Sequence, residues 1–328
     1  MKHHKSSFLF TTRQGQSKMT PTVIVNGTTL TRDEIIALSS YHYIPSQPVA
    51  IIMLVLFGLA TLIHLGLATK YRLFWLFPTV CLCGLGEVIG WSGRLWSSIN
   101  PIASDPFEMQ ITCTIIAPTP FLAANFIIFG DLIRRLGFKY SRLNPKWYSI
   151  IFCSCDVVSL VVQAAGGAIA SGNSLQSSIT GAHIMIGGIA IQLVVIVFFS
   201  LFALEYFVRY FYDRPVRVDW AKLEASSSTT LTGLGEFRGK LTTRRKVMSC
   251  ALAFTTLLLF IRAIYRLIEL SDGWRGRIIS NELYFNVLDA TMIVIVMYTA
   301  LFIHPGHFLS EPTSSEKYAV ELKAPGQI

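Results

Sequence analysis

The chain has 328 residues, of which 52% are hydrophobic and only 14% are charged. Soluble proteins carry about a quarter charged residues, so this composition excludes an ordinary soluble domain and indicates an integral membrane protein. The formal net charge of +9 would suggest a nucleic-acid partner for a soluble protein. In a membrane protein, basic residues in the links between spans indicate which side faces the cytoplasm, so we predict no nucleic-acid partner.

The first 47 residues precede the apolar runs, and we expect them to form an extracellular tail. Their basic residues are not followed by an apolar core long enough for a cleaved signal peptide. This tail contains the one N-glycosylation sequon of the chain, Asn26-Gly27-Thr28. Asn26 is therefore the predicted glycosylation site.

Seven later runs are apolar over the length of about 20 residues that crosses a bilayer as a helix. We predict an all-α, seven-transmembrane helix bundle over residues 48–308, with spans at 48–69, 73–98, 109–133, 147–171, 180–208, 247–270 and 282–303. The link between the first two spans is short, so they should form an antiparallel hairpin. The fifth run is longer than a bilayer requires and should tilt or extend beyond the interface.

The basic residues predict the orientation of the spans. Lys and Arg are frequent in the links after spans one, three and five, whereas the opposite side has only Arg275 and Arg277, between spans six and seven. The positive-inside rule places the basic side in the cytoplasm, so the N-terminus is expected outside and the C-terminus inside. Residues 309–328 are then a cytoplasmic tail, predicted to be disordered.

The longest cytoplasmic link, residues 209–246, is polar, rich in glycine and expected to be flexible. It contains Gly239-Lys240, which invites comparison with a phosphate-binding loop. The pattern fails because Leu234 stands where the first glycine belongs and Leu241 where a Ser or Thr would hold magnesium. We therefore predict no nucleotide site and no cofactor, and we expect cytoplasmic regulators, if any, to bind on this loop.

Polar side chains within the spans mark the candidate site. A charge at mid-membrane costs roughly 2.5–3.5 kcal/mol on insertion scales, so each one needs a partner or water. The candidates for substrate binding or translocation are Glu87, Arg94, Asp156, Gln163, Gln192, Arg262, Arg266, Glu269, Glu282, Asn286 and Asp289. Within spans two, four, six and seven their spacings are 3, 4 or 7, which keeps them on one helical face. We expect these stripes to point inward.

The predicted orientation places this polar set at the middle and outer depth of the membrane. One interpretation is structural: Arg262 and Arg266 are neutralised by Glu87, Asp289 or Glu269. The other is functional: the set lines an outward-facing cavity that binds a polar head group. The acids of these spans outnumber the arginines, so a surplus carboxylate could receive a cationic amine. Both interpretations can hold for different residues.

Other features of the spans have simpler explanations. Gly86 and Gly90 allow close helix packing, and the prolines of spans two and three predict kinks. His64 and His183 have no partners at metal-ligand spacing, and we assign them packing or interface roles. His304 precedes Pro305-Gly306 and reads first as a helix stop. The six cysteines all lie in apolar runs and resemble packing residues, so we predict no metal site.

Several separated motifs, found in order between about residues 50 and 308, resemble one known family. They are Glu87-x-x-Gly90-x-x-x-Arg94, Ala117-Pro118, Ala123-Ala124, Asp156-x-x-Ser159-x-x-x-Gln163-x-x-Gly166-Gly167, Gly188-x-x-x-Gln192, Arg262-x-x-Tyr265-Arg266-x-x-Glu269, Gly273-x-x-Gly276, Glu282, Asp289 and His304-Pro305-Gly306. This pattern is similar to the fungal lipid-translocating exporter family, whose members include 7-aminocholesterol resistance proteins. The residues between and around these motifs are most similar to the sphingoid long-chain base exporter branch of this family. Trp91 and Asn125 depart from the usual residues at their positions.

The resemblance implies a multi-pass plasma-membrane protein, not an enzyme, that moves or releases lipids and confers resistance to toxic amphiphiles. Its implied partners are membrane lipids such as sphingoid bases. A second hypothesis is a lipid receptor or sensor that regulates membrane lipid asymmetry without transport, because seven spans with an outside N-terminus suit that class equally well. The sequence leaves both open.

Overall fold

A computed structural model of the chain describes residues 24–25, 28–172, 174–216, 239, 241–274 and 276–308. The predicted glycosylation site Asn26 and the predicted tail 309–328 lie outside the described residues, as does most of the loop at 209–246.

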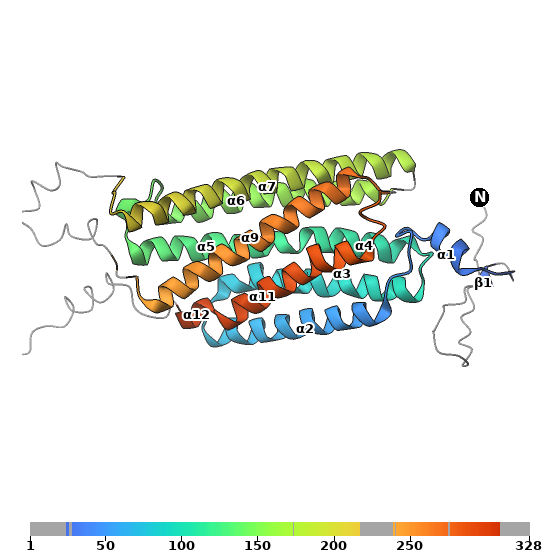
Figure 1. Cartoon of the computed structure of the whole chain (residues 1–328), viewed down its shortest axis with the longest axis horizontal. Coiled ribbons are helices and arrows are strands. Elements are labelled where there is room, and N and C mark those ends of the chain that lie inside the picture. Colours follow the sequence, from blue (N-terminus) through green and yellow to red (C-terminus); the bar gives the residue numbers. More distant parts are fainter. Residues whose placement is uncertain are drawn as a thin grey trace, which may run out of the picture.

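Seven helical spans make up the structure (Figure 1). They are α2 (Gln47–Lys70); η1 (Phe74–Leu76), η2 (Phe77–Cys81) and α3 (Leu82–Ile99); α4 (Ser104–Ile116) and α5 (Pro118–Leu136); α6 (Pro145–Ala170); α7 (Leu175–Phe211); α9 (Thr243–Ser271); and α10 (Glu282–Phe285), η5 (Asn286–Thr291), α11 (Met292–Phe302) and α12 (Pro305–Phe308). A two-residue strand pair, β1 (Ile24–Val25) and β2 (Thr28–Thr29), and helix α1 (Arg32–Leu38) precede them, and the short helix η3 (Phe138–Tyr140) follows α5.

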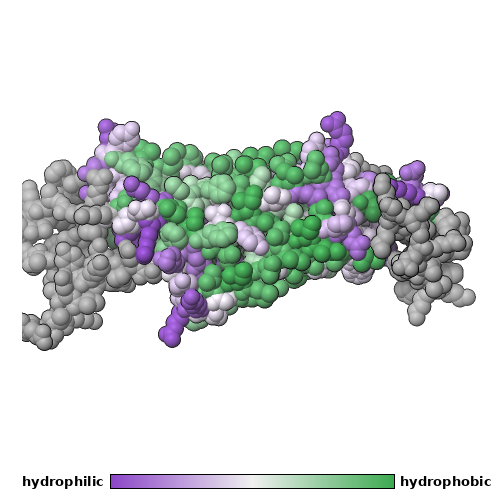
Figure 2. Space-filling model, turned by 60° about the horizontal axis from the view of Figure 1, so that its bottom comes forward, coloured by the Kyte–Doolittle hydropathy of each residue, from purple (hydrophilic) through white to green (hydrophobic). Residues whose placement is uncertain are grey.

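The spans run up and down along one long axis, and this confirms the predicted seven-helix bundle. Helices α6 and α7 lie along one edge in Figure 1, and α2 lies along the opposite edge. Figure 2 shows a hydrophobic band between two hydrophilic ends, as a bilayer requires. We call the end that holds α1 the N-terminal end and the end that holds α12 the C-terminal end.

The predicted fifth span is the longest helix. Helix α7 has 37 residues, which corresponds to about 55 Å at 1.5 Å per residue. The hydrocarbon core is about 30 Å thick, so α7 must extend beyond it or tilt. This agrees with the expectation from its length.

Two spans contain a π-helical segment, and a third is broken. Pro78 lies in the π-helix η2, and α4 gives way to α5 at Ala117, directly before Pro118. Both prolines therefore lie where the regular α-helix is interrupted, and the kinks expected there stay a prediction. The sequence did not predict the π-helix η5. Within it, the Thr291 hydroxyl donates a hydrogen bond of 2.7 Å to the Asn286 carbonyl, five residues earlier.

Small residues allow close packing between neighbouring spans. A Cβ built on Gly86 would lie 2.8 Å from Ala117 Cβ, and one on Gly90 would lie 2.7 Å from Thr114 Cγ2. These two glycines thus bring α3 against α4 and the start of α5, as predicted. Between α6 and α7, a Cβ on Gly181 would overlap the backbone of Gly166 and Ala170.

We predict that Gly181→Ala lowers the free energy of unfolding by about 1–3 kcal/mol, because the added methyl group overlaps backbone that cannot turn aside. Gly187→Ala is the matched control, since no atom lies within 4 Å of a Cβ at that position of the same helix. It should leave stability unchanged or raise it by up to about 1 kcal/mol through helix propensity. Thermal unfolding of the two purified variants in one detergent measures the difference. Equal midpoints would contradict the packing described here.

Candidate functional site

Seven of the predicted polar residues gather in the N-terminal half of the bundle, on α3, α9, α10 and η5. We call this set the charged cluster; it consists of Glu87, Arg94, Arg262, Arg266, Glu269, Glu282 and Asp289. All except Glu282 are buried. The inward direction expected from helical spacing therefore holds for six of them, and Glu282 lies at the margin with its side chain 24% exposed.

Asp289 is shared by two arginines of the neighbouring helix. Arg266 binds it in a bidentate manner, with Nη2 2.6 Å from Oδ2 and Nε 2.9 Å from Oδ1. Arg262 Nε lies 2.7 Å from the same Oδ1. Arg266 also donates to Glu269 Oε2 at 2.7 Å. Two arginines and two acids thus neutralise one another, as the structural interpretation expects.

The same arginines also bind helix α4. Arg266 Nη2 donates to the Thr114 hydroxyl at 2.7 Å, and Arg262 Nη2 donates to the Thr114 carbonyl. Thr114 is fully buried and lies against Gly90 of α3. The glycine of α3 and the arginines of α9 therefore meet at one point on α4.

Arg94 lies nearer the N-terminal end, with no exposed surface. Its Nη2 donates to Glu282 Oε1 and to the Tyr43 hydroxyl, both at 3.0 Å, and Nη1 donates to Gln110 Oε1 at 3.1 Å. Glu282 belongs to span seven, so this ion pair connects α3 to α10.

Aromatic rings enclose the Arg94 guanidinium. Its centre lies 4.7 Å from the ring centroid of Phe285 and 5.5–5.6 Å from those of Tyr41, Tyr43 and Trp91. A desolvated cation over aromatic faces gains about 2 kcal/mol in favourable cases. These ring contacts, together with the ion pair to Glu282, stabilise the buried positive charge of Arg94.

The segment before the first span covers this end of the cluster. Tyr41 donates to Gln110 Oε1 at 2.5 Å, and the Ser46 backbone N–H donates to Glu282 Oε1 at 2.8 Å. Burial raises the pKa of Tyr41 to about 12, so its hydroxyl stays protonated at physiological pH and remains a donor. The N-terminal segment is therefore part of the site and not only a tail.

Glu87 is the exception within the charged cluster. It is 1% exposed, and neither carboxylate oxygen accepts a hydrogen bond from the residues that the structure describes. Arg262, Arg266 and Asp289 are its charged neighbours, but it forms no ion pair with the arginines. The Trp91 indole is close enough to interact with it but falls short of hydrogen-bond geometry. Of the three acids expected to neutralise Arg262 and Arg266, Asp289 and Glu269 form ion pairs with them. Glu87 is their charged neighbour without a direct ion pair in this conformation.

Three of the four remaining predicted residues lie on α6 and α7, which carry no member of the charged cluster. Gln163 of α6 donates to Gln192 Oε1 of α7 at 3.0 Å and to Ser159 at 2.9 Å. Asp156 is buried on α6, and within the described part of the chain its oxygens have no hydrogen-bond partner. Asn286, between Glu282 and Asp289 on span seven, is half-buried, and its side-chain oxygen is buried without a hydrogen-bond partner among the described residues.

Sequence reasoning missed several members of the site, chiefly Gln110, Thr114, Tyr41 and Tyr43. Gln110 and Thr114 are four residues apart in an apolar run, and the same stripe rule applied to span three would have found them. No pattern in the sequence indicated the two tyrosines, because they precede the first span.

Comparison with known proteins places this fold in a family. The sequence model described as "RTA1 like protein" matches residues 80–312, which extend from η2 beyond α12. The chain belongs to the RTA1-like family. The matched region contains the whole charged cluster but not the covering segment with Tyr41 and Tyr43.

Three relatives from Saccharomyces cerevisiae show the range of names in the family. The chain is similar to sphingoid long-chain base transporter RSB1, with 32% identity over 80% of this chain and 72% of the relative. It is also similar to protoporphyrin uptake protein 1, with 25% identity over 78% and 89%, and to protein RTA1, with 26% identity over 78% and 82%. The match to RSB1 agrees with the sphingoid-base branch predicted from the motifs. No solved structure is significantly similar to the chain.

We predict that Asp289→Asn lowers the free energy of unfolding by about 3–5 kcal/mol, because it leaves buried Arg262 without its acid and Arg266 with Glu269 alone. Arg142→Gln is the control, since Arg142 is 56% exposed in its pair with Glu205 and should cost less than about 1 kcal/mol. Denaturant unfolding in detergent micelles compares the two variants. Similar losses for both would show that the buried pairs do not hold the bundle together.

Proposed function

We propose that the protein is a transporter that exports amphiphilic lipids, in particular sphingoid long-chain bases, toward the outer leaflet and so confers resistance to toxic lipids. The seven apolar helices make it a multi-pass membrane protein. Relatives named for base transport and for protoporphyrin uptake support a membrane transporter role. The plasma membrane as its location, and the direction of movement, are parts of this proposal.

The unpaired carboxylate of Glu87 carries the proposal. A buried acid without a hydrogen bond is costly, and such groups in membrane proteins concentrate on substrate and ion paths. An amphiphile with a primary amine brings an ammonium group with three donors, which Glu87 can accept. The neighbouring arginines already bind Asp289 and Glu269, so Glu87 is the acid of the charged cluster that can receive a cation without first losing an ion pair.

The direction of export rests on the predicted orientation. If the basic links face the cytoplasm, the charged cluster lies at middle and outer depth, and its covering segment faces the outside. An amine bound at Glu87 would then lie closer to the outer leaflet, while its alkyl chain stays among apolar side chains.

The site is closed in this conformation, because Glu87 is buried and Tyr41 and Tyr43 cover the outer end of the cluster. Substrate access therefore requires helix movement. The π-helices η2 and η5 belong to the spans that hold Glu87 and Asp289. Such segments carry strained hydrogen bonding and are common at functional sites, so we expect the spans to shift there.

We predict that Glu87→Gln reduces transport of phytosphingosine at least about tenfold, because an amide cannot form an ion pair with the ammonium group. The replacement has the same shape and disturbs no hydrogen bond seen here, so the variant should fold normally. Asp105→Asn is the matched control, since Asp105 is an exposed acid at the same end. The measurement is release of labelled phytosphingosine from proteoliposomes, together with the tolerance of a sensitive yeast strain.

The same experiment separates transport from reception. A receptor or sensor would bind phytosphingosine saturably without moving it across the liposome membrane. No movement by the wild-type protein would therefore overturn the transporter proposal. Equal rates for wild type and Glu87→Gln would remove Glu87 from the substrate path.

A further inference from the structure

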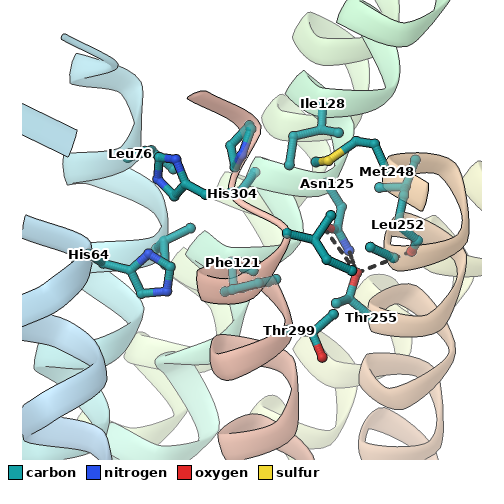
Figure 3. A pocket seen from close by; sticks show the side chains of 16 residues that line it. His64, Leu76, Phe121, Asn125, Ile128, Met248, Leu252, Thr255, Thr299 and His304 are labelled. Atoms are coloured by element: carbon teal, nitrogen blue, oxygen red, sulfur yellow. Dashed lines mark hydrogen bonds between the residues drawn. The ribbon is translucent and has the colours of Figure 1, made fainter. Parts of the chain in front are cut away.

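A small cavity lies in the C-terminal half of the bundle, between α2, α5, α9 and α11. It offers about 20 Å³ of free space, enough for one water-sized group. Most of its lining is apolar, including Leu76, Phe121 and Leu252. Figure 3 shows His64 across the cavity from Thr255 and Leu252.

Two buried histidine nitrogens in this cavity lack partners. His64 is 0% exposed and His304 is 4% exposed, and their ring centroids lie 6.2 Å apart. His64 Nδ1 and His304 Nε2 form no hydrogen bond within the described residues. Buried polar atoms are nearly always paired, so each needs an explanation.

The other nitrogen of each ring shows what the free one can do. His64 Nε2 lies 3.1 Å from the Met297 carbonyl oxygen, which can only accept, so Nε2 carries the proton and Nδ1 is an acceptor. His304 Nδ1 accepts from the Gly306 backbone N–H at 3.1 Å, so in the neutral ring Nε2 carries the proton and is a donor. Two residues that line the cavity thus carry one free acceptor and one free donor among the described residues, and because both nitrogens are buried a ligand reaches them only when the cavity widens.

A hydroxyl group satisfies this pair, because it donates one hydrogen bond and accepts others. An ammonium group offers donors alone and would leave the His304 N–H unpaired. A carboxylate offers acceptors alone and would leave His64 Nδ1 unpaired. The chemistry therefore favours a hydroxyl, supplied either by water or by an alcohol.

The opposite wall of the cavity separates it from an apolar groove on the membrane-facing surface between α7 and α9. Asn125 Nδ2 donates to Thr255 and to Thr256, both at 3.2 Å. Thr255 faces the cavity, Thr256 lines the groove, and Leu252 borders both. One thin wall of three hydrogen-bonded side chains and one leucine thus divides the two spaces.

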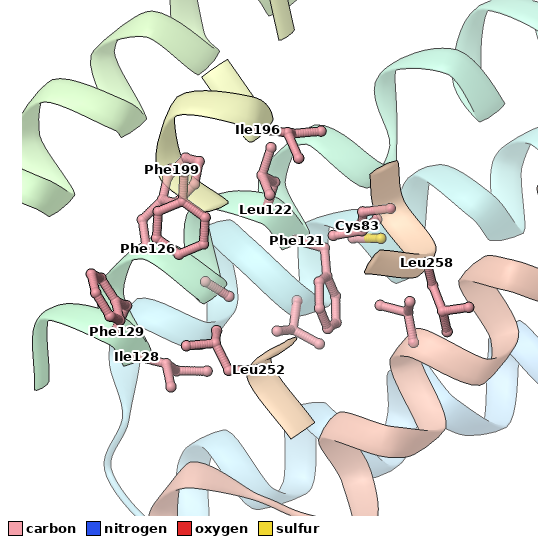
Figure 4. Packing of buried hydrophobic residues seen from close by; sticks show 14 of the residues in the cluster. Cys83, Phe121, Leu122, Phe126, Ile128, Phe129, Ile196, Phe199, Leu252 and Leu258 are labelled. Carbon is pink, nitrogen blue, oxygen red and sulfur yellow. The ribbon is translucent and has the colours of Figure 1, made fainter. Parts of the chain in front are cut away.

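The groove has room for an alkyl chain. It offers about 470 Å³ of free space and is lined mainly by aliphatic and aromatic side chains, with Leu201, Leu204 and Leu257 exposed along it. Its floor is firm, since Phe199 packs against Phe126 and Phe129 with ring centroids 4.7 and 5.4 Å apart (Figure 4). Both helices that form it belong to the apolar band, where the surrounding molecules are lipid chains.

We propose that the His64–His304 cavity is a second binding site, specific for a hydroxyl group of a membrane amphiphile whose alkyl chain occupies the α7–α9 groove. The Asn125–Thr255–Thr256 contacts form the closure between head-group cavity and groove. This assignment rests on the proposed function in taking the amphiphile to be a transported one. It adds a hydroxyl-selective site at the opposite end of the bundle from the amine site at Glu87.

The test compares two ligands that share an amine and an 18-carbon chain. Dihydrosphingosine carries hydroxyl groups and octadecylamine carries none. We expect wild-type protein in nanodiscs to bind dihydrosphingosine more tightly, measured by scintillation proximity with tritiated dihydrosphingosine and competition by octadecylamine. His64→Gln keeps a donor for the Met297 carbonyl, and His304→Asn keeps an acceptor for the Gly306 N–H. Each should reduce the preference about three- to tenfold by removing one hydrogen bond.

Exposed histidines supply the controls. His183→Gln and His307→Asn change residues at the surface of α7 and α12 and should leave the preference unchanged. A wild-type protein without preference, or cavity variants that weaken both ligands equally, would overturn the proposal and indicate a site for water alone. Lost preference in the cavity variants combined with no transport by wild type would overturn the transporter function but retain this site.

A second measurement does not depend on the variants. Dihydrosphingosine with a diazirine in its alkyl chain should label wild-type protein along the α7–α9 groove, and unlabelled dihydrosphingosine should compete. Labelling confined to other helices would contradict the proposed position of the chain.

Discussion

The bundle depends on one carboxylate, because Asp289 forms ion pairs with both Arg262 and Arg266. Two guanidinium groups inside an apolar bundle would be prohibitive without it, and Glu269 alone could neutralise only one. The same arginines bind Thr114, so the interaction connects α9, η5 and α4. Close packing at Gly90 then brings α3 to the same point. Lipid provides no hydrophobic driving force for helices to associate. Ion pairs and close packing at small residues hold these helices together instead.

The π-helix η5 explains how this carboxylate reaches its partners. Glu282 and Asn286 of this span are both half-buried, whereas Asp289, inside the π-helix, is 1% exposed. The wider turn admits an extra residue and changes the direction in which later side chains point. The segment that carries Asp289 thus also interrupts the regular α-helical hydrogen bonding of span seven. The ion pairs that stabilise the bundle and the position at which we expect the span to shift therefore lie in the same segment.

Much of this could be predicted from the sequence, because lipid imposes strong rules. Apolar run length predicted seven spans, and the spacing of charges predicted that Arg262, Arg266 and Asp289 point inward together. The missed features depend on tertiary contacts without periodicity. Tyr41 and Tyr43 contact Arg94 from a segment that precedes the spans. The position of Glu87 on its helix also did not predict that the arginines pair with Asp289 and Glu269 instead. The orientation of the termini remains a prediction from charge.

The contrast between the two ends of the bundle bears on how an amphiphile could be moved. In the charged cluster Arg262 and Arg266 are paired, and exchanging their partners would expose buried charge at a cost of several kcal/mol. Among the described residues, Glu87 in one half and one ring nitrogen each of His64 and His304 in the other have no hydrogen-bond partner, so each can bind a new group without first losing an old contact. An amine suits Glu87 and a hydroxyl suits the two histidines, and both groups occur on one sphingoid head group. A path between them need not break the ion pairs that hold the fold. The pairs of Arg262 and Arg266 with Asp289 can persist while the spans shift at η2 and η5, and the contacts at Asn125 and Tyr43, which are mainly hydrogen bonds between side chains, open and close.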